Sequence, residues 1–279
     1  MPILLPPAEA HLYYLPTHDR PELADPAALA LFRSWMTKEE CARCDRYVFE
    51  HSRHEYTLTR ALVRRALSLY ADVEPAAWRF RTGSHGKPEI AEPRGHEAIR
   101  FNLSNTRGLI ALLIVRDHEV GVDVEDTDRK SQTVEVAERY FSPLEVAALR
   151  ALPESERRAR FFEYWTLKEA YIKARGLGLS IPLEQFSFVL DPRDRPISIR
   201  FDARLGDDPA RWQFAQLELT PRHATAAAIA RPGTQPVRYV IRELAPAQPA
   251  ALVEPGAGAG AGAGPGPGPG PGPGRISRR

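Results

Sequence analysis

Two short stretches of the sequence constrain the fold most strongly, because together they place three carboxylates in contexts that a hydrophobic core does not favour. In the first stretch, Val120 to Glu125, valines alternate with Gly121, Asp123 and the final glutamate. Alternation with a period of two predicts a half-buried strand whose two acids leave the same face.

The second stretch, residues 165–173, predicts a helix. Four residues recur at helical spacing in and just before it: Phe161, Trp165, Glu169 and Ile172. One carboxylate therefore lies in an otherwise apolar stripe, and a carboxylate is costly to bury unless its charge is compensated. A divalent cation shared with the two acids of the strand would compensate it. Hard oxygen ligands of this kind suit magnesium bound together with a substrate phosphate.

The two stretches together resemble the signature of a known family. The pattern Gly-Val-Asp-x-Glu at 121–125, followed by Trp-Thr-x-Lys-Glu-Ala-x-x-Lys at 165–173, is similar to that of the 4′-phosphopantetheinyl transferases of the two-lobed Sfp type. Four further segments match in the right order: Gly86-Lys87-Pro88, Phe101-Asn102-Leu103-Ser104, Phe141-Ser142-Pro143-Leu144-Glu145 and Gly176-Leu177-Gly178-Leu179-Ser180. The resemblance covers roughly residues 30 to 190, so one short chance match does not account for it.

The resemblance implies an activity and a fold. Enzymes of this type move 4′-phosphopantetheine from coenzyme A to a serine of an apo carrier protein, an acyl or peptidyl carrier, and release adenosine 3′,5′-bisphosphate. They are monomers of two similar lobes related by a pseudo-two-fold axis, with coenzyme A in the cleft between them. We therefore expect an α+β fold, Mg²⁺ as cofactor, and coenzyme A and a carrier protein as substrates.

The order of the predicted elements agrees with a doubled α+β fold. Helical patterns between Pro26 and Tyr70 precede strand patterns that end at Val124, and helical patterns over 134–175 precede strand patterns over 186–243. Helices followed by strands, twice over, favour two similar lobes.

We assign the lobes and the tail by residue range. Residues 1–118 form an N-terminal lobe that binds the nucleotide of coenzyme A, and residues 119–247 form a C-terminal lobe with the metal and catalytic motifs. Residues 248–279 contain alternating Gly-Ala and Gly-Pro. A segment of this composition has nothing to bury, so we expect a disordered tail.

By resemblance, three acids bind the metal ion: Asp123, Glu125 and Glu169. Asp123 and Glu169 correspond to the firm ligands of the family, and Glu125 corresponds to the third. The alternative for Glu125 is an exposed carboxylate at the end of the strand. Asp126 and Asp128 follow closely, and we expect both in the turn after the strand.

The resemblance assigns catalytic roles to Lys173 and Glu145. Lys173 would neutralise the pyrophosphate of coenzyme A; an ordinary helix pair with Glu169, worth about 0.2–0.5 kcal/mol, is the alternative. Glu145 would deprotonate the carrier serine. The alternative for Glu145 is structural, because Pro143 predicts the first residue of a helix and an acid in the first turn interacts favourably with the helix dipole.

The resemblance also assigns coenzyme A contacts, mainly to the first lobe: Arg53, Lys87, Pro88, Ser104 and Asn105, with Lys168 and Lys173 from the second. Taken alone, Gly86-Lys87-Pro88 is a turn signal. Lys168 has two interpretations, a phosphate contact or a side chain that faces the carrier. Relatives commonly carry histidine where this chain has Asn105, whose amide donates a hydrogen bond but bears no positive charge.

Composition disfavours several other functions. The net charge is +2, from 38 basic and 36 acidic residues, which argues against a protein that coats nucleic acid. No apolar run has the length of a membrane span, and the N-terminal residues lack the pattern of a secretory signal. We therefore expect a cytoplasmic protein that has no membrane or nucleic-acid partner.

Two alternative functions and one alternative site follow from other residues. A non-catalytic protein that binds coenzyme A or a nucleotide would not require the full set of Asp123, Glu169 and Lys173. A nucleic-acid-binding module would use the arginines between residues 43 and 65. Cys41 and Cys44, followed by two histidines, invite a zinc site, but the interval to the first histidine is about half that of the usual zinc finger.

Overall fold

The computed structural model describes residues 2–83, 86–129, 133–190, 197–231, 233 and 235–246. The chain divides into two units, Met1–Gln248 and Pro249–Arg279. The predicted tail, 248–279, lies outside the described residues. None of the helices within the described ranges has the length and hydropathy that a membrane crossing requires.

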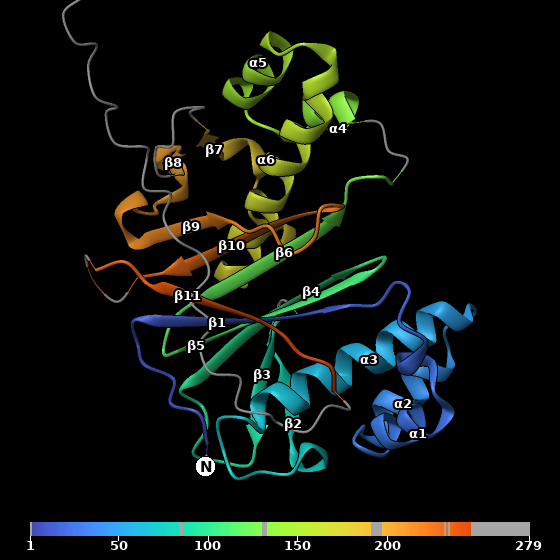
Figure 1. Cartoon of the computed structure of the whole chain (residues 1–279). Coiled ribbons are helices and arrows are strands. Elements are labelled where there is room, and N and C mark those ends of the chain that lie inside the picture. Colours follow the sequence, from blue (N-terminus) through green and yellow to red (C-terminus); the bar gives the residue numbers. More distant parts are fainter. Residues whose placement is uncertain are drawn as a thin grey trace, which may run out of the picture. The chain divides into compact units, whose positions relative to one another are not determined.

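The first unit is an α+β fold in which one order of elements occurs twice (Figure 1). The first repeat contains β1 (Glu9–Pro16), α1 (Pro26–Ser34), α2 (Lys38–Asp45), α3 (Glu50–Leu67), β2 (Arg79–Thr82), β3 (Pro88–Glu92), β4 (Ile99–Thr106) and β5 (Leu109–Arg116). The second contains β6 (Val120–Asp126), α4 (Thr133–Tyr140), α5 (Pro143–Ala151), α6 (Glu154–Arg175), β7 (Phe186–Val189), β8 (Ser198–Phe201), β9 (Trp212–Gln216) and β10 (His223–Ala230). β11 (Arg238–Glu243) follows.

Short 3-10 helices connect these elements at Pro21–Ala24, Pro75–Ala77, Gly178–Ser180, Leu183–Gln185, Ala203–Leu205 and Pro209–Arg211. The two repeats form sheets of the same strand order, β1-β5-β4 and β6-β10-β9. The expected α+β fold of two similar lobes is therefore confirmed. β11 falls in the range assigned to the second lobe, yet it pairs in parallel with β1 at the edge of the first sheet.

The two sheets pack face to face, and a long helix covers the outer face of each (Figure 1). The sequence of β5 is continuously apolar because both faces of the strand are buried. Ile110, Leu112 and Ile114 belong to the core beneath α3, while the residues between them belong to the core shared with β6 and β10. A strand buried on both faces has no polar face to reveal a period of two.

β6 and α6 approach each other unusually closely at Gly121. A Cβ atom at this position would lie 2.0 Å from the carbonyl oxygen of Ala170 and 2.5 Å from the backbone nitrogen of Ala174. Both atoms belong to the α6 backbone, so a side chain could not be accommodated by a rotamer change. Because alternate residues share a strand face, Asp123 lies on the same α6-facing side as Gly121.

Two helix starts lie where the sequence predicts them, whereas the strands β1 and β3 are not predicted. Thr37 and Glu40 form a capping box at the start of α2, and Pro143 is the first residue of α5. β1 gives little sequence signal, because most of its residues are buried and polar alternation is absent. β3 has five residues and belongs to a two-stranded hairpin. Asp126 is the last residue of β6 instead of a turn residue.

We predict that Gly121→Ala lowers the free energy of unfolding by at least about 2 kcal/mol, because the added methyl group meets the α6 backbone. Urea unfolding of purified protein measures the effect. Gly233→Ala is the matched control: an added Cβ there has no atom within 4 Å, so its change should stay within about 0.5 kcal/mol. Equal stability of the two variants would contradict the close packing of β6 and α6.

Candidate active site

Asp123, Ser104 and Lys173 meet where β4, β6 and α6 converge. Lys173 Nζ donates to Asp123 Oδ1 at 2.5 Å and to Ser104 Oγ at 2.9 Å. Ser104 Oγ in turn donates to the same Asp123 oxygen at 3.0 Å. Asp123 is 4% exposed, so water screens its negative charge only weakly. The charge is compensated by the ammonium group of Lys173.

Glu169 lies one helical turn before Lys173 and is half-buried. It accepts no hydrogen bond from the residues that the structure describes. Burial raises the pKa of the Glu169 carboxyl, and the negative charge of Asp123 raises it further, while Lys173 lowers it. The strand acid Asp123 is therefore close enough to the helix acid Glu169 to influence its charge state.

Glu125 shares the face of Asp123 but has its own partners. Trp165 Nε1 donates to one carboxylate oxygen at 3.0 Å, and the Arg129 guanidinium lies 2.9 Å from the other. Burial raises the pKa of Glu125 to about 7, the charge of Asp123 acts in the same direction, and Arg129 opposes both. Glu125 is therefore neither an exposed strand-end acid nor a group without partners.

The donor set fits a divalent cation in part. Asp123 Oδ2 is buried and has no hydrogen-bond partner, which leaves one oxygen of a charged group for a ligand. Glu169 likewise has oxygen atoms without a hydrogen-bond donor among the described residues. No group of three or more His, Cys, Asp or Glu side chains in the described ranges is arranged to hold a metal ion. The oxygens of Glu125 contact Trp165 and Arg129 instead.

Glu145 and Lys168 lie apart from this site, as a buried ion pair between α5, α6 and β7. Their side chains are 0% and 1% exposed, and Lys168 Nζ lies 2.8 Å from Glu145 Oε2. Glu145 also accepts hydrogen bonds from the Ser142 backbone, the Ser142 hydroxyl and the Phe188 backbone. Lys168 donates to the carbonyl oxygens of Leu183 and Phe186. Burial lowers the pKa of Lys168, and Glu145 opposes this shift.

This enclosure bears on the roles predicted for both residues. Glu145 has donors on both carboxylate oxygens and no exposed surface, so the structure does not place it where a carrier serine could reach it. The ammonium group of Lys168 is likewise surrounded by protein oxygens and by the ring of Phe186 at 4.2 Å. The contacts favour the structural alternative for Glu145, a capping box at the start of α5.

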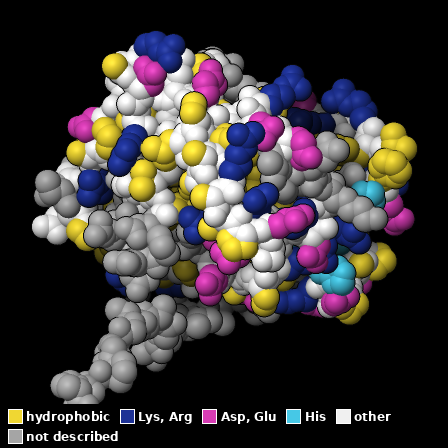
Figure 2. All heavy atoms as spheres, turned by 90° about the horizontal axis from the view of Figure 1, so that it is seen from above, with side chains coloured by type: hydrophobic (Ala, Val, Ile, Leu, Met, Phe, Trp, Pro, Cys, Tyr) yellow, Lys and Arg dark blue, Asp and Glu magenta, His cyan; other side chains and the backbone are white. Residues whose placement is uncertain are grey.

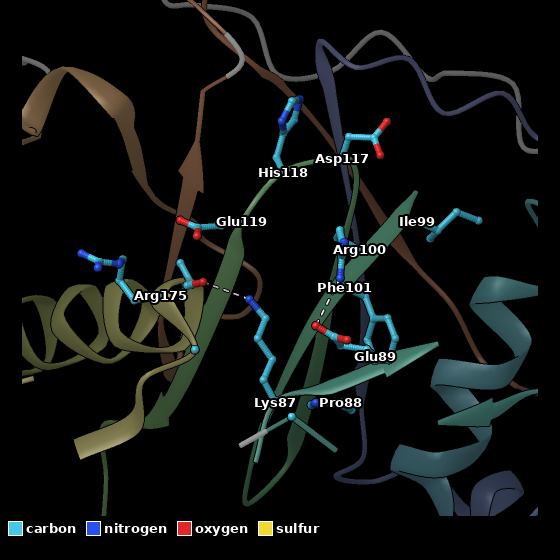
Figure 3. Close-up of a pocket in the computed structure, with 13 residues that line it drawn as sticks. Lys87, Pro88, Glu89, Ile99, Arg100, Phe101, Asp117, His118, Glu119 and Arg175 are labelled. Carbon is cyan, nitrogen blue, oxygen red and sulfur yellow. Dashed lines mark hydrogen bonds and ion pairs between the residues drawn. The ribbon is translucent and has the colours of Figure 1, made fainter. Parts of the chain in front are cut away.

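Two predicted coenzyme A residues, Lys87 and Pro88, line a pocket of about 350 Å³ (Figure 3). The pocket lies between the β2–β3 hairpin, the start of β4, the β5–β6 turn and the end of α6. Lys87 Nζ donates to the carbonyl oxygens of Val120 and Ala174 at 2.8 and 3.0 Å. A cation on the last carbonyls of α6 also interacts favourably with the helix dipole. Burial lowers the pKa of Lys87 to about 8.

The structure does not bring Arg53 and Asn105 into contact with these groups. Arg53 donates to the carbonyl oxygens of Tyr47 and Val48, and so holds the turn between α2 and α3. Asn105 is exposed on β4 and makes no side-chain hydrogen bond within the described ranges. Because neighbouring residues of a strand face opposite sides, Asn105 lies on the other face of β4 from Ser104.

The sequence did not predict the contacts that three residues make in the site region. Trp165 and Arg129 hold Glu125, and the side-chain oxygen of Asn102 accepts a hydrogen bond from the β6 backbone. A signal for Asn102 was available. Asn102 and Ser104 alternate with apolar residues in a predicted strand, which is the pattern of a polar strand face. The hydrogen bond between Trp165 and Glu125 could not be predicted from a local pattern, because the two residues are far apart in sequence.

Part of the chain is similar to a known family model and to a solved structure. The model of the 4′-phosphopantetheinyl transferase superfamily matches residues 119–230. Among solved structures, the chain is similar to holo-[acyl-carrier-protein] synthase of Thermotoga maritima, with a TM-score of 0.33 and 21% identity, over 40% of this chain and 62% of that chain.

Two curated relatives extend the similarity over most of the chain. The 4′-phosphopantetheinyl transferase HetI of Nostoc sp. is 34% identical over 230 residues, which are 82% of this chain and 90% of the relative. The 4′-phosphopantetheinyl transferase Sfp of Bacillus subtilis is 31% identical over 202 residues, 72% of this chain and 85% of the relative. The chain therefore belongs to the 4′-phosphopantetheinyl transferase superfamily, and the resemblance drawn from its motifs is confirmed.

We predict that Lys168→Met lowers the free energy of unfolding by about 3–5 kcal/mol, because Glu145 is left buried without its counter-charge. The double variant Lys168→Met/Glu145→Gln should recover part of this loss, since no unpaired charge remains. Urea unfolding of the two single variants and the double variant measures the coupling.

The exposed pair of Arg150 and Glu138 supplies the control for this cycle. Arg150→Ala should change the free energy of unfolding by less than about 1 kcal/mol, because both side chains are solvated. If Lys168→Met kept full stability but weakened coenzyme A binding, the phosphate contact predicted from the family would hold and the buried pair would be contradicted.

Proposed function

We propose that this chain uses Mg²⁺ to transfer 4′-phosphopantetheine from coenzyme A to a serine of an acyl or peptidyl carrier protein, and that it acts as a cytoplasmic monomer. Membership of the superfamily makes it a transferase of the phosphopantetheine group. The observation that carries the residue assignments is the convergence of Asp123, Glu169 and Lys173 where β6 packs on α6.

The proposal assigns the metal to the strand and helix acids. Asp123 and Glu169 would hold the ion, with Glu125 as the third ligand after it releases Arg129 or Trp165. When bound, a divalent cation would neutralise the charge that develops on the pyrophosphate oxygens. In support, Asp123 has a free buried oxygen and Glu169 has no hydrogen-bond donor within the described ranges.

Lys173 would supply the positive charge beside the transferring group. It is paired with Asp123, and its side chain is 27% exposed, which supports access for an anionic substrate. The reaction joins the carrier serine oxygen to the phosphorus that bears pantetheine and releases adenosine 3′,5′-bisphosphate. A lysine fixed before substrate arrives stabilises that leaving phosphate without reorganisation.

The carrier serine must also lose a proton. Glu145 corresponds to the base implied by the family motif, but its enclosure gives it no access to a serine hydroxyl. We therefore propose a structural role for Glu145 and Lys168. We propose that a carboxylate or a water molecule at the Asp123 site removes the proton of the carrier serine. The comparisons give no support to a non-catalytic protein, since relatives that match most of the chain are named as transferases.

Nucleic-acid binding has no supporting surface on the face seen in Figure 2. Lys and Arg side chains are interspersed there with Asp and Glu, and do not gather into one basic patch (Figure 2). Binding of nucleic acid rests on many phosphate contacts made together, which interspersed charge of both signs does not provide.

The decisive experiment incubates the protein with coenzyme A, Mg²⁺ and several apo carriers, and measures the phosphopantetheine mass added to each carrier. We expect a gain on at least one carrier, loss of the gain in EDTA, and a fall in rate of more than about 100-fold in Glu169→Gln. Glu163→Gln is the control on the same helix: Glu163 pairs with Arg160 outside the site, so the rate should stay within about twofold.

Two outcomes would count against the proposal. A folded protein that binds coenzyme A but adds no mass to any carrier would contradict transferase activity. Full activity in EDTA would contradict the metal assignment while leaving the reaction itself in place.

A further inference from the structure

The two sheets meet at β4 and β6 through side chains instead of a backbone ladder. β4 is an edge strand of the first sheet and β6 is an edge strand of the second. Three side chains of β4 accept hydrogen bonds from three backbone N–H groups of β6, at 2.9, 3.3 and 3.4 Å. We call this arrangement the β4–β6 seam, with the pairs Asn102–Val122, Ser104–Val124 and Thr106–Asp126.

Strand geometry explains why the seam takes this form. In an antiparallel pair, alternate residues direct their N–H groups to opposite sides. The N–H groups that β6 directs away from β10 need other acceptors, because Val122 and Val124 are buried. Residues two apart on β4 share one face, so Asn102, Ser104 and Thr106 meet three N–H groups with the same spacing.

Ser104 is the member of the seam that also contacts the site. Its hydroxyl donates to Asp123 Oδ1 and accepts from Lys173 Nζ and from the Val124 backbone. A hydroxyl has one proton to donate and two lone pairs. All three are used by the protein, and the side chain is 6% exposed. Ser104 therefore has no hydrogen-bonding capacity left for a phosphate of coenzyme A.

We propose that Ser104 is a positioning residue for the transfer reaction: it fixes Asp123 and Lys173 relative to each other and ties both to the β4–β6 seam. This inference rests on the proposed function of Asp123 and Lys173. It differs from the coenzyme A contact that the family resemblance implies for Ser104. Without the hydroxyl, the Lys173 ammonium loses one of its two anchors and Asp123 Oδ1 loses one of its two donors.

The test compares Ser104→Ala with Ser104→Thr. Steady-state rates are measured at varied coenzyme A, together with coenzyme A affinity by calorimetry and the unfolding midpoint. We expect Ser104→Ala to lower kcat by about 10–100-fold, with KM and calorimetric Kd for coenzyme A within about threefold. Ser104→Thr keeps a hydroxyl at the same strand position, so it should restore kcat to within about threefold of the wild type.

Thr106→Val is the matched control. Thr106 lies on the same strand and face and bonds the backbone N–H of Asp126, but it contacts neither Asp123 nor Lys173. Its removal should leave kcat within about twofold. Ser104→Cys replaces the hydroxyl with a thiol, which is a weaker hydrogen-bond donor, and should give a kcat between those of wild type and Ser104→Ala. This variant replaces Ser104→Ala in the test if Ser104→Ala does not fold.

Three results would overturn the inference. A rise in KM and Kd for coenzyme A at constant kcat would make Ser104 a substrate contact. A lower unfolding midpoint with unchanged kcat would make its role merely structural. A loss of kcat in Thr106→Val equal to that in Ser104→Ala would assign the effect to the whole seam. Wild-type protein that modifies no carrier would instead be a failure of the proposed function.

Discussion

The site depends on the contact between the backbones of β6 and α6 at Gly121. An added Cβ atom would lie 2.0 Å from the Ala170 carbonyl oxygen, so this strand and this helix touch without an intervening side chain. The next residue on the same strand face is Asp123, and the next turn of the helix carries Lys173. The close approach thus brings a strand acid and a helix lysine within 2.5 Å.

The acidic residues of the family motifs divide into two physical classes. Burial and the charge of Asp123 raise the pKa of Glu169. Both residues have carboxylate oxygens that accept no hydrogen bond within the described ranges, as expected of groups that can bind a ligand. Glu145 is fully enclosed, and its charge and hydrogen bonds are met by Lys168 and by the start of α5. Removing one partner of such a pair is strongly destabilising, because the other charge then stays buried without compensation.

Sequence patterns predict most of the fold and the elements that carry Asp123, Glu169 and Lys173. The period of two correctly predicts a strand at β6. Its prediction of a half-buried strand is wrong, because α6 also covers the face that carries Gly121 and Asp123. The helical period predicts α6, which carries Glu169 and Lys173, because such patterns depend only on local geometry. β1 escapes prediction because burial on both faces removes alternation. The partners of Glu145, Ser104 and Lys87 could not be predicted, because they belong to other helices and strands and a local pattern does not indicate which elements pack together.

The most direct test of the central claim is a double-mutant cycle between Asp123→Asn and Lys173→Gln, read in kcat/KM for coenzyme A with a saturating apo carrier. If the two side chains act as one unit across the β6–α6 contact, the double variant should lose little more activity than the more impaired single variant. Losses that multiply, as for independent sites, would contradict the account.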